Sequence, residues 1–278
     1  MLVAAFRGWN DGAQGASLAA GFLAQQFGAR RFGDIDPEEF YDFQATRPLV
    51  ALEEGMTRRV DWPENAFYHA ELPAASRDIV LLLGIEPNLR WRTFCATIAG
   101  LAGELGVELV VTLGALLADV PHTRPAPVTG SASDPDLVRE LGLTFSRYEG
   151  PTGIVGVLHD ACGAAGLPSA SLWAAVPHYA SLASSPRAAL ALCSRLGVLL
   201  DTSFDLEELE RAAEAYERQV SEAVAQDEET QQYVLELERR RDAIGDELDI
   251  PSGDTLAAEL TRFLREHEAR RREEDEEE

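Results

Sequence analysis

The chain has 278 residues, of which 46% are hydrophobic, so it can form the core of one large domain with an appendage. Its formal net charge of −24 would repel the phosphates of nucleic acid, and all 24 of its basic residues are arginine, which excludes a Schiff-base lysine and the lysine of a P-loop. No apolar run reaches the roughly 20 residues of a membrane span, and the three cysteines are widely separated, so we expect a cytoplasmic protein that binds neither nucleic acid nor membrane.

The first 204 residues alternate short apolar runs with helical patterns, which predicts β-α-β units and a mostly parallel sheet. Strands are predicted over Leu2–Phe6, Asp78–Gly84, Val107–Leu113, Gly153–Leu158 and Ala170–Val176. Helices are predicted over Ala13–Phe27, Arg92–Leu105, Asp134–Leu141, Asp160–Ala165 and Pro186–Leu199. The aromatic segment Asp34–Leu72 is expected to hold two shorter strands. Residues 1–204 are therefore predicted to form an α/β body.

From Asp205 the pattern changes to acidic amphipathic helices. Apolar residues recur every three or four positions at Leu206, Leu209, Ala213, Tyr216, Val220 and Ala223, with Asp205 as the predicted cap. The stripe lapses at Gln226–Glu229 and resumes at Tyr233, Leu237 and Ile244, and a last helix is predicted over Leu256–Glu268. We expect residues 205–270 to form an acidic helical extension packed on the body, and 271–278 a solvated, disordered tail.

The tripeptide Val-Pro-His occurs at the end of two predicted strands, as Val120–His122 and as Val176–His178. Proline ends a strand because it has no N–H to donate, and ligand sites of open α/β sheets lie beyond the carboxyl ends of the strands. If a site exists here, His122 and His178 should meet at one rim of the sheet. Chance similarity of the two segments is the alternative.

Two further loops follow predicted strands. The Gly-rich loop Arg7–Gly15 contains Asn10 and Asp11, but it matches neither a dinucleotide fingerprint nor a P-loop, so a tight turn is the simpler interpretation. Glu86 is placed either to bind a ligand or to form a structural ion pair with Arg90 or Arg92.

The densest polar cluster is Asp119–Pro125, in which a carboxylate, an imidazole and a guanidinium lie within six residues. Such groups orient a general acid or base and bind anions. No nucleophile elbow and no metal-ligand spacing accompany them, so we assign no catalytic residue and expect no metal or cofactor. The candidate cleft comprises Asn10, Asp11, Glu86, Arg90, Asp119, His122, Arg124 and His178.

Six segments together resemble one protein family. They are Gly-Trp-Asn-Asp-Gly at 8–12, Glu-Glu-Phe-Tyr-Asp-Phe at 38–43, Gly-Ile-Glu-Pro-Asn-Leu-Arg-Trp at 84–91, Gly-Ala-Leu-Leu-Ala-Asp-Val-Pro-His-Thr-Arg-Pro at 114–125, Tyr-Glu-Gly-Pro-Thr-Gly-Ile at 148–154 and Ser-Leu-Trp-Ala-Ala-Val-Pro-His-Tyr at 171–179. As a set they resemble an actinobacterial member of the proteasome assembly chaperone 2 family. The resemblance is strong over residues 1–200 and looser over the helical end.

The resemblance implies a three-layer α/β/α body related to nucleoside phosphorylases, a C-terminal helical extension and homo-oligomers, with a trimer suspected. It also implies a chaperone-like protein whose partners are proteasome subunits or another protein. Such chaperones dock by a C-terminal hydrophobic–Tyr–any-residue motif, whereas residues 273–278 are all acidic. Docking by that route is therefore not expected unless the native terminus lies further on.

Two functional hypotheses follow. The first is a non-enzymatic interaction or assembly factor, because no complete catalytic motif accompanies the resemblance. The alternative is a phosphorylase- or hydrolase-like enzyme or ligand binder that uses the candidate cleft, with His122 or His178 as acid or base and Arg124 as the anion clamp. Fold analogy alone is a weak argument for that chemistry.

Overall fold

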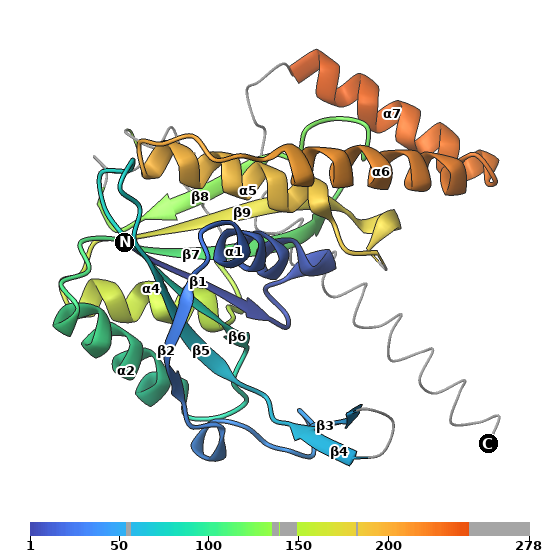
Figure 1. The fold of residues 1–278 in the computed structure, drawn as a ribbon. Helices are drawn as coiled ribbons and strands as arrows, with labels where there is room; N and C mark the ends of the chain where they lie inside the picture. The colour runs from blue at the N-terminus through green and yellow to red at the C-terminus, as the bar shows by residue number, and fades with distance from the viewer. Residues whose placement is uncertain (54–56, 135–138, 140–148, 182, 245–278) are drawn as a thin grey trace.

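A seven-stranded sheet forms the centre of the molecule (Figure 1), in a computed structural model that describes residues 1–53, 57–134, 139, 149–181 and 183–244. The strand order is β2-β5-β6-β1-β7-β9-β8. These strands are β1 (Leu2–Arg7), β2 (Arg30–Ile35), β5 (Asn65–Ala70), β6 (Ile79–Ile85), β7 (Val110–Ala118), β8 (Val128–Ala132) and β9 (Ser169–Pro177).

The strands β6, β1, β7 and β9 are parallel, and the strands on either side of them join by antiparallel pairing. β1 pairs in parallel with β6 and β7, and β7 pairs in parallel with β9, whereas β2, β5 and β8 join by antiparallel pairing. Ala118 of β7 is in register with Pro177 of β9, so the two Val-Pro-His loops leave the sheet side by side. The carboxyl ends of the parallel strands therefore form one rim, which carries the loops after β1, β6, β7 and β9.

Helices cover both faces of the sheet, which confirms the predicted three-layer architecture (Figure 1). α1 (Gly15–Gln26) and α5 (Pro186–Leu199) lie on one face, and α2 (Trp91–Glu104) and α4 (Ile154–Ala164) lie on the other. The alternation of β1 shows why: Val3 and Ala5 pack toward α1 and α5, while Leu2 and Phe6 pack toward α2 and α4. Such strands are buried on both faces and therefore form continuous apolar runs.

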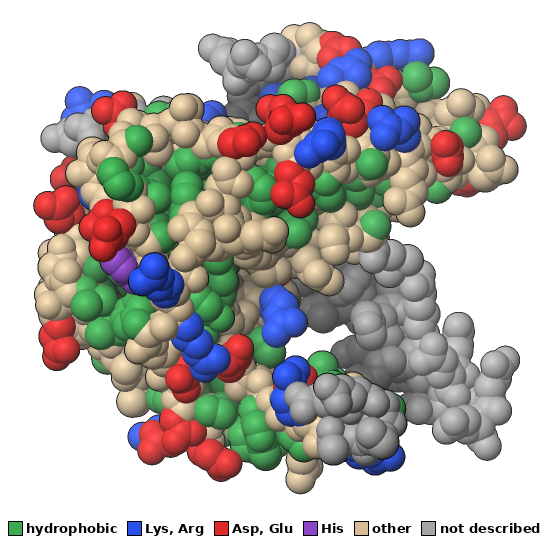
Figure 2. All heavy atoms as spheres, viewed as in Figure 1, with side chains coloured by type: hydrophobic (Ala, Val, Ile, Leu, Met, Phe, Trp, Pro, Cys, Tyr) green, Lys and Arg blue, Asp and Glu red, His purple; other side chains and the backbone are tan. Residues whose placement is uncertain are grey.

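Two acidic helices, α6 (Glu207–Val224) and α7 (Glu228–Ile244), follow the body, and we call them the arm. α6 packs on α5 and buries Leu209, Ala213, Tyr216, Val220 and Val224, of which the last three also cluster with Val234 of α7. Acidic and basic side chains line the outward face of the arm (Figure 2). The predicted amphipathic helix is thus present, although its cap is Leu206 and Asp205 only accepts a bond from the Glu207 amide at 3.1 Å.

A two-stranded hairpin, β3 (Leu49–Glu53) and β4 (Thr57–Asp61), projects away from the three layers (Figure 1). Val50 pairs with Val60 and Leu52 pairs with Arg58, and because side chains alternate along a strand, these four lie on one face of the hairpin. Its apolar members, Val50, Leu52 and Val60, are exposed, from 46% for Val60 to 65% for Leu52. The hairpin therefore presents three exposed apolar side chains on one face, which we call the hairpin face.

One predicted strand is wrong. Residues 153–158 open helix α4 and do not form a strand, and the helix continues through the predicted Asp160–Ala165 segment. A short apolar run does not distinguish a buried strand from a buried helix. In α4 the buried residues Ile154, Val155, Leu158 and Cys162 follow helical spacing.

Other element boundaries also differ from prediction. β7 begins three residues later than expected and runs to Ala118. The edge strands β2 and β8 were not predicted, because neither is an apolar run. Residues 34–72 hold β3, β4 and β5, one strand more than expected. Most of the helix predicted at 134–141, and all of that at 256–268 and the tail at 271–278, lie outside the described residues. No helix in the described part is long and apolar enough to cross a membrane.

Candidate functional site

Six of the eight predicted site residues fall into two separate groups at the carboxyl rim of the sheet. The first, which we call the Glu86 cluster, contains Glu86 after β6, Trp9 and Asn10 after β1, and Ile154 at the start of α4. The Glu86 Oε1 accepts hydrogen bonds from Asn10 Nδ2 and from the Ile154 amide, both at 2.8 Å, and Oε2 accepts one from the Trp9 amide at 3.3 Å. A carboxylate at a helix N-terminus is favoured by the helix dipole. Through these hydrogen bonds Glu86 links the loop after β1, the end of β6 and the start of α4.

Two glycines allow this close approach. Gly8 has a φ of 139°, and a Cβ there would lie 3.0 Å from the Glu86 Cβ. At Gly153, the residue that caps α4, a Cβ would lie 2.3 Å from Asn10 Oδ1. Asn10 is only 1% exposed, and its Oδ1 has no hydrogen-bond partner among the described residues.

The Asp11 carboxylate forms hydrogen bonds to the backbone at the start of α1. Its Oδ1 accepts hydrogen bonds from the Ala16 amide at 2.8 Å and the Ser17 amide at 3.2 Å, at the start of α1. Burial raises the pKa of Asp11, and these hydrogen bonds oppose that rise. Arg90 lies apart from Glu86 and pairs with Glu39 at 2.5 Å. Among the described residues Glu86 forms no ion pair, so the predicted pairing with Arg90 or Arg92 does not occur.

The second group, which we call the histidine cluster, consists of Asp119, His122, Arg124, His178 and the neighbouring Tyr179. The Tyr179 ring lies 5.7 Å from the rings of both His122 and His178. The Tyr179 hydroxyl is 2.9 Å from His122 Nδ1 and accepts a 2.9 Å hydrogen bond from the His122 amide. His178 Nδ1 lies 3.2 Å from Asp119 Oδ1. The two Val-Pro-His loops thus meet, and Asp119 is with them.

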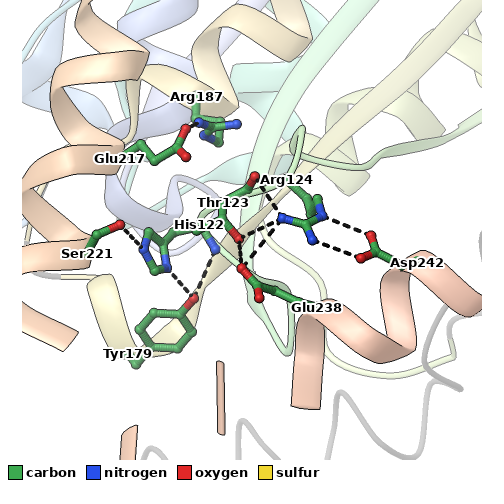
Figure 3. Close-up of polar contacts among 9 residues, drawn as sticks. All are labelled: His122, Thr123, Arg124, Tyr179, Arg187, Glu217, Ser221, Glu238 and Asp242. Atoms are coloured by element: carbon green, nitrogen blue, oxygen red, sulfur yellow. Dashed lines mark hydrogen bonds and ion pairs between the residues drawn. The ribbon is translucent and has the colours of Figure 1, made fainter. Parts of the chain in front are cut away.

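The arm supplies the remaining partners of this cluster (Figure 3). Ser221 Oγ of α6 lies 2.9 Å from His122 Nε2. Arg124 binds the Asp242 carboxylate of α7 through two hydrogen bonds, of 2.9 and 2.8 Å, and also lies 3.5 Å from Glu238. Further bonds join Thr123 to Glu238, and Tyr233 to Asp119 at 2.5 Å.

Burial dominates the electrostatics of the cluster. It lowers the pKa of His122, with Arg187 acting in the same direction and Glu217 opposing it. It also raises the pKa of Tyr179 to about 12. The neutral Nε2–H tautomer of His122 satisfies both contacts, because the ring then donates to Ser221 and accepts at Nδ1 from Tyr179. His122 is therefore held neutral between the body and the arm.

Sequence reasoning found the histidine cluster but missed its arm partners. Glu238 and Asp242 are four residues apart, which places both carboxylates on one face of α7. That spacing is visible in the sequence, but it does not predict that the two carboxylates bind a loop more than 110 residues earlier. The Ile154 amide was missed because residues 153–158 were predicted as a strand. Among the described residues, no group of three or more His, Cys, Asp or Glu side chains could hold a metal ion.

Comparison with known proteins places the whole body in one family. The sequence profile of the PAC2 family matches residues 5–224. A Streptomyces avermitilis PAC2 family protein is 49% identical, with a TM-score of 0.78 over 84% of this chain and 98% of that one. A Mycobacterium tuberculosis protein described as a proteasome-assembly chaperone homologue is 46% identical, with a TM-score of 0.77 over 84% of this chain and 99% of that one.

A more distant relative shares the fold. A Pyrococcus furiosus protein described as an archaeal homologue of proteasome-assembly chaperone is 21% identical, with a TM-score of 0.60 over 83% of this chain and 94% of that one. No curated protein sequence matches the chain. The family resemblance inferred from the six sequence segments is confirmed: the chain belongs to the PAC2 family.

Proposed function

We propose that the protein is an interaction factor of the assembly-chaperone type, whose partners are proteasome subunits or another protein. The observation that carries this proposal is the family membership, together with the 46% identity to a protein described as a proteasome-assembly chaperone homologue. We further propose that it acts in the cytoplasm as a homo-oligomer, with a trimer as the expected state. Light scattering on the purified chain measures that state directly.

The hairpin face supports a protein partner. Val50, Leu52 and Val60 place three exposed apolar side chains on one side of a projecting hairpin. Contiguous exposed apolar surface of this kind marks interaction sites, and an isolated two-stranded hairpin is only marginally stable in water. A partner that covered this face would stabilise the hairpin.

The histidine cluster supports the same conclusion by its contacts. Both ring nitrogens of His122 are bound within the chain, and the Arg124 guanidinium is held by carboxylates of α7. These groups join the body to the arm. Because these side chains already bind residues of the arm, the geometry favours an interaction protein over an enzyme in which they would contact a substrate.

The test is direct binding to a purified actinobacterial proteasome α-subunit, measured by native mass spectrometry. We expect a complex with the wild-type chain, and about ten-fold weaker binding when Leu52→Asp places a charge on the hairpin face. Leu49→Asp is the matched control, because Leu49 is 69% exposed but points to the opposite side of the hairpin. Absence of any complex, or equal loss in both variants, would contradict the proposal.

A small-molecule binder remains the second candidate, favoured by one observation. Asn10 Oδ1 in the Glu86 cluster and Oδ2 of the adjacent Asp11 are buried acceptors without a hydrogen-bond partner among the described residues. Buried polar atoms are almost always satisfied, so a bound donor is one explanation. A thermal-shift screen with nucleosides, phosphate and small carboxylic acids tests it, because a ligand of the native state must raise the melting temperature.

A further inference from the structure

The two helices of the arm are attached to the body by different kinds of contact. α6 has five buried side chains, and its Arg187–Glu217 ion pair to α5 is partly buried. In the described part of α7, only Val234 and Leu237 are buried. Val234 clusters with buried residues of α6, and the polar contacts of α7 to the body come from Tyr233, Glu238 and Asp242.

The polar attachment of α7 centres on Arg124. The Asp242 carboxylate meets the guanidinium through two parallel hydrogen bonds, and Glu238 contacts both Thr123 and Arg124. The Arg124 side chain is 34% exposed and that of Asp242 is 57% exposed. Ion pairs at such exposure are screened by solvent and contribute little each.

The loop that carries Arg124 is stiff, and it lies where open α/β sheets bind ligands. Pro121, Pro125 and Pro127 each fix a φ angle, which restricts the conformations of the loop whether or not α7 is in place. α7 also lies over the histidine cluster, since the Tyr233 ring is 5.6 Å from that of His178 and 6.1 Å from that of Tyr179. Departure of α7 would therefore uncover His178, Tyr179 and Arg124 on a preformed surface.

We propose that α7 is a releasable lid over the histidine cluster, and that its Glu238 and Asp242 carboxylates occupy Arg124 while the lid is closed. Elements with little buried apolar surface and exposed polar contacts are the ones that open locally while the rest of a fold stays intact. The open form would present a guanidinium, an imidazole and a phenol ring, which fit a carboxylate-bearing segment of a partner. This inference goes beyond the proposed function, because the lid opens or stays shut whether or not a proteasome subunit binds.

The test is hydrogen exchange of the full chain, followed by mass spectrometry on peptides from α6, α7 and the central strands. In Arg124→Gln we expect exchange of α7 amides to rise about five-fold, the size of one partly exposed bidentate pair. Amides of α6 and the strands should keep the wild-type rate. In the wild-type chain, about 1 M NaCl should raise exchange of α7 selectively, because salt screens the same contacts.

Arg240→Gln is the matched control. Arg240 lies on the same helix, and its ion pair with Glu236 stays within α7. Its removal should leave exchange of α7 unchanged. The proposal is overturned if α7 exchanges together with α6 in both salt conditions, or if Arg124→Gln and Arg240→Gln have equal effects.

Discussion

At the residue scale, glycines determine how closely the rim loops approach one another. Any side chain at Gly153 would overlap Asn10, which is itself held by Glu86. We expect Gly153→Ala to lower the free energy of unfolding by about 1–3 kcal/mol, the usual cost of overpacking. Gly100→Ala in α2 is the control: a Cβ there meets nothing within 4 Å, and alanine favours a helix by about 1 kcal/mol. Urea unfolding distinguishes the two, and equal effects would contradict the geometry.

Glu86 allows a second test at this scale. Glu86→Gln keeps the size of the side chain but removes the charge that accepts bonds from Asn10 and from the α4 terminus. We expect a loss of about 1.5–3 kcal/mol in the free energy of unfolding, as for other hydrogen bonds to charged groups. Glu39→Gln, which breaks the exposed pair with Arg90, should cost less than about 0.5 kcal/mol. A Glu86 variant as stable as the Glu39 variant would show that the hydrogen bonds of Glu86 do not stabilise the fold.

The sequence indicated which residues lie at strand ends, but not how they pair. His122 and His178 were expected to meet only if a site exists there, since each follows a predicted buried strand, and β7 and β9 are neighbours. The division into two groups was not predictable, because it depends on where α4 and α7 pack. Asp11 illustrates the limit: from the sequence it is a cleft carboxylate, whereas in the fold it caps α1.

At the scale of elements, His122 links the docking of the arm to pH. Burial lowers its pKa in the folded chain below the unfolded value of about 6.5. As the pH falls below about 6.5, the unfolded chain therefore binds the proton first, and the native state loses stability until the folded pKa is reached. The contribution of neutral His122 to the stability of the native state is therefore complete above about pH 6.5.

Unfolding by urea at about pH 7.5 and about pH 5.5 measures this effect. The wild-type chain should lose more stability between the two pH values than His122→Gln. His159, whose pKa is also lowered by burial, is present in both chains and cancels in the difference. An equal loss in the two chains would mean that folding does not lower the pKa of His122.

Strongly patterned elements were predictable, and weakly patterned ones were not. The helix expected at Pro186–Leu199 has those bounds, because proline starts it and its buried positions follow helical spacing. α4 was partly predicted as a strand because Ile154, Val155, Val157 and Leu158 are β-branched or apolar in a short run. The hairpin face carries no sequence signal of its exposure, since Val50 and Leu52 would suit a buried strand equally well.

At the scale of the whole molecule, the three cysteines are distributed over both helix layers, so the reactivity of their thiols measures whether either layer opens. Cys95 in α2 and Cys162 in α4 lie on one face of the sheet, and Cys193 in α5 lies on the other. All three are buried, and burial raises the pKa of Cys95 to about 12, of Cys162 to about 11 and of Cys193 to about 12. Only the thiolate reacts with alkylating reagents, so the native thiols should be inert.

Iodoacetamide labelling at about pH 8, counted by mass spectrometry, tests whether the body unfolds as one unit. We expect no label on the native chain and three labels above the urea midpoint, with the three sites labelled in parallel. Arg124→Gln, which opens only α7 in our proposal, should label no faster than the wild-type chain. Earlier labelling of Cys193 alone would mean that α1 and α5 separate from the sheet first. Parallel labelling would show that both helix layers of the body open together, because Cys95, Cys162 and Cys193 lie on opposite faces of the same sheet.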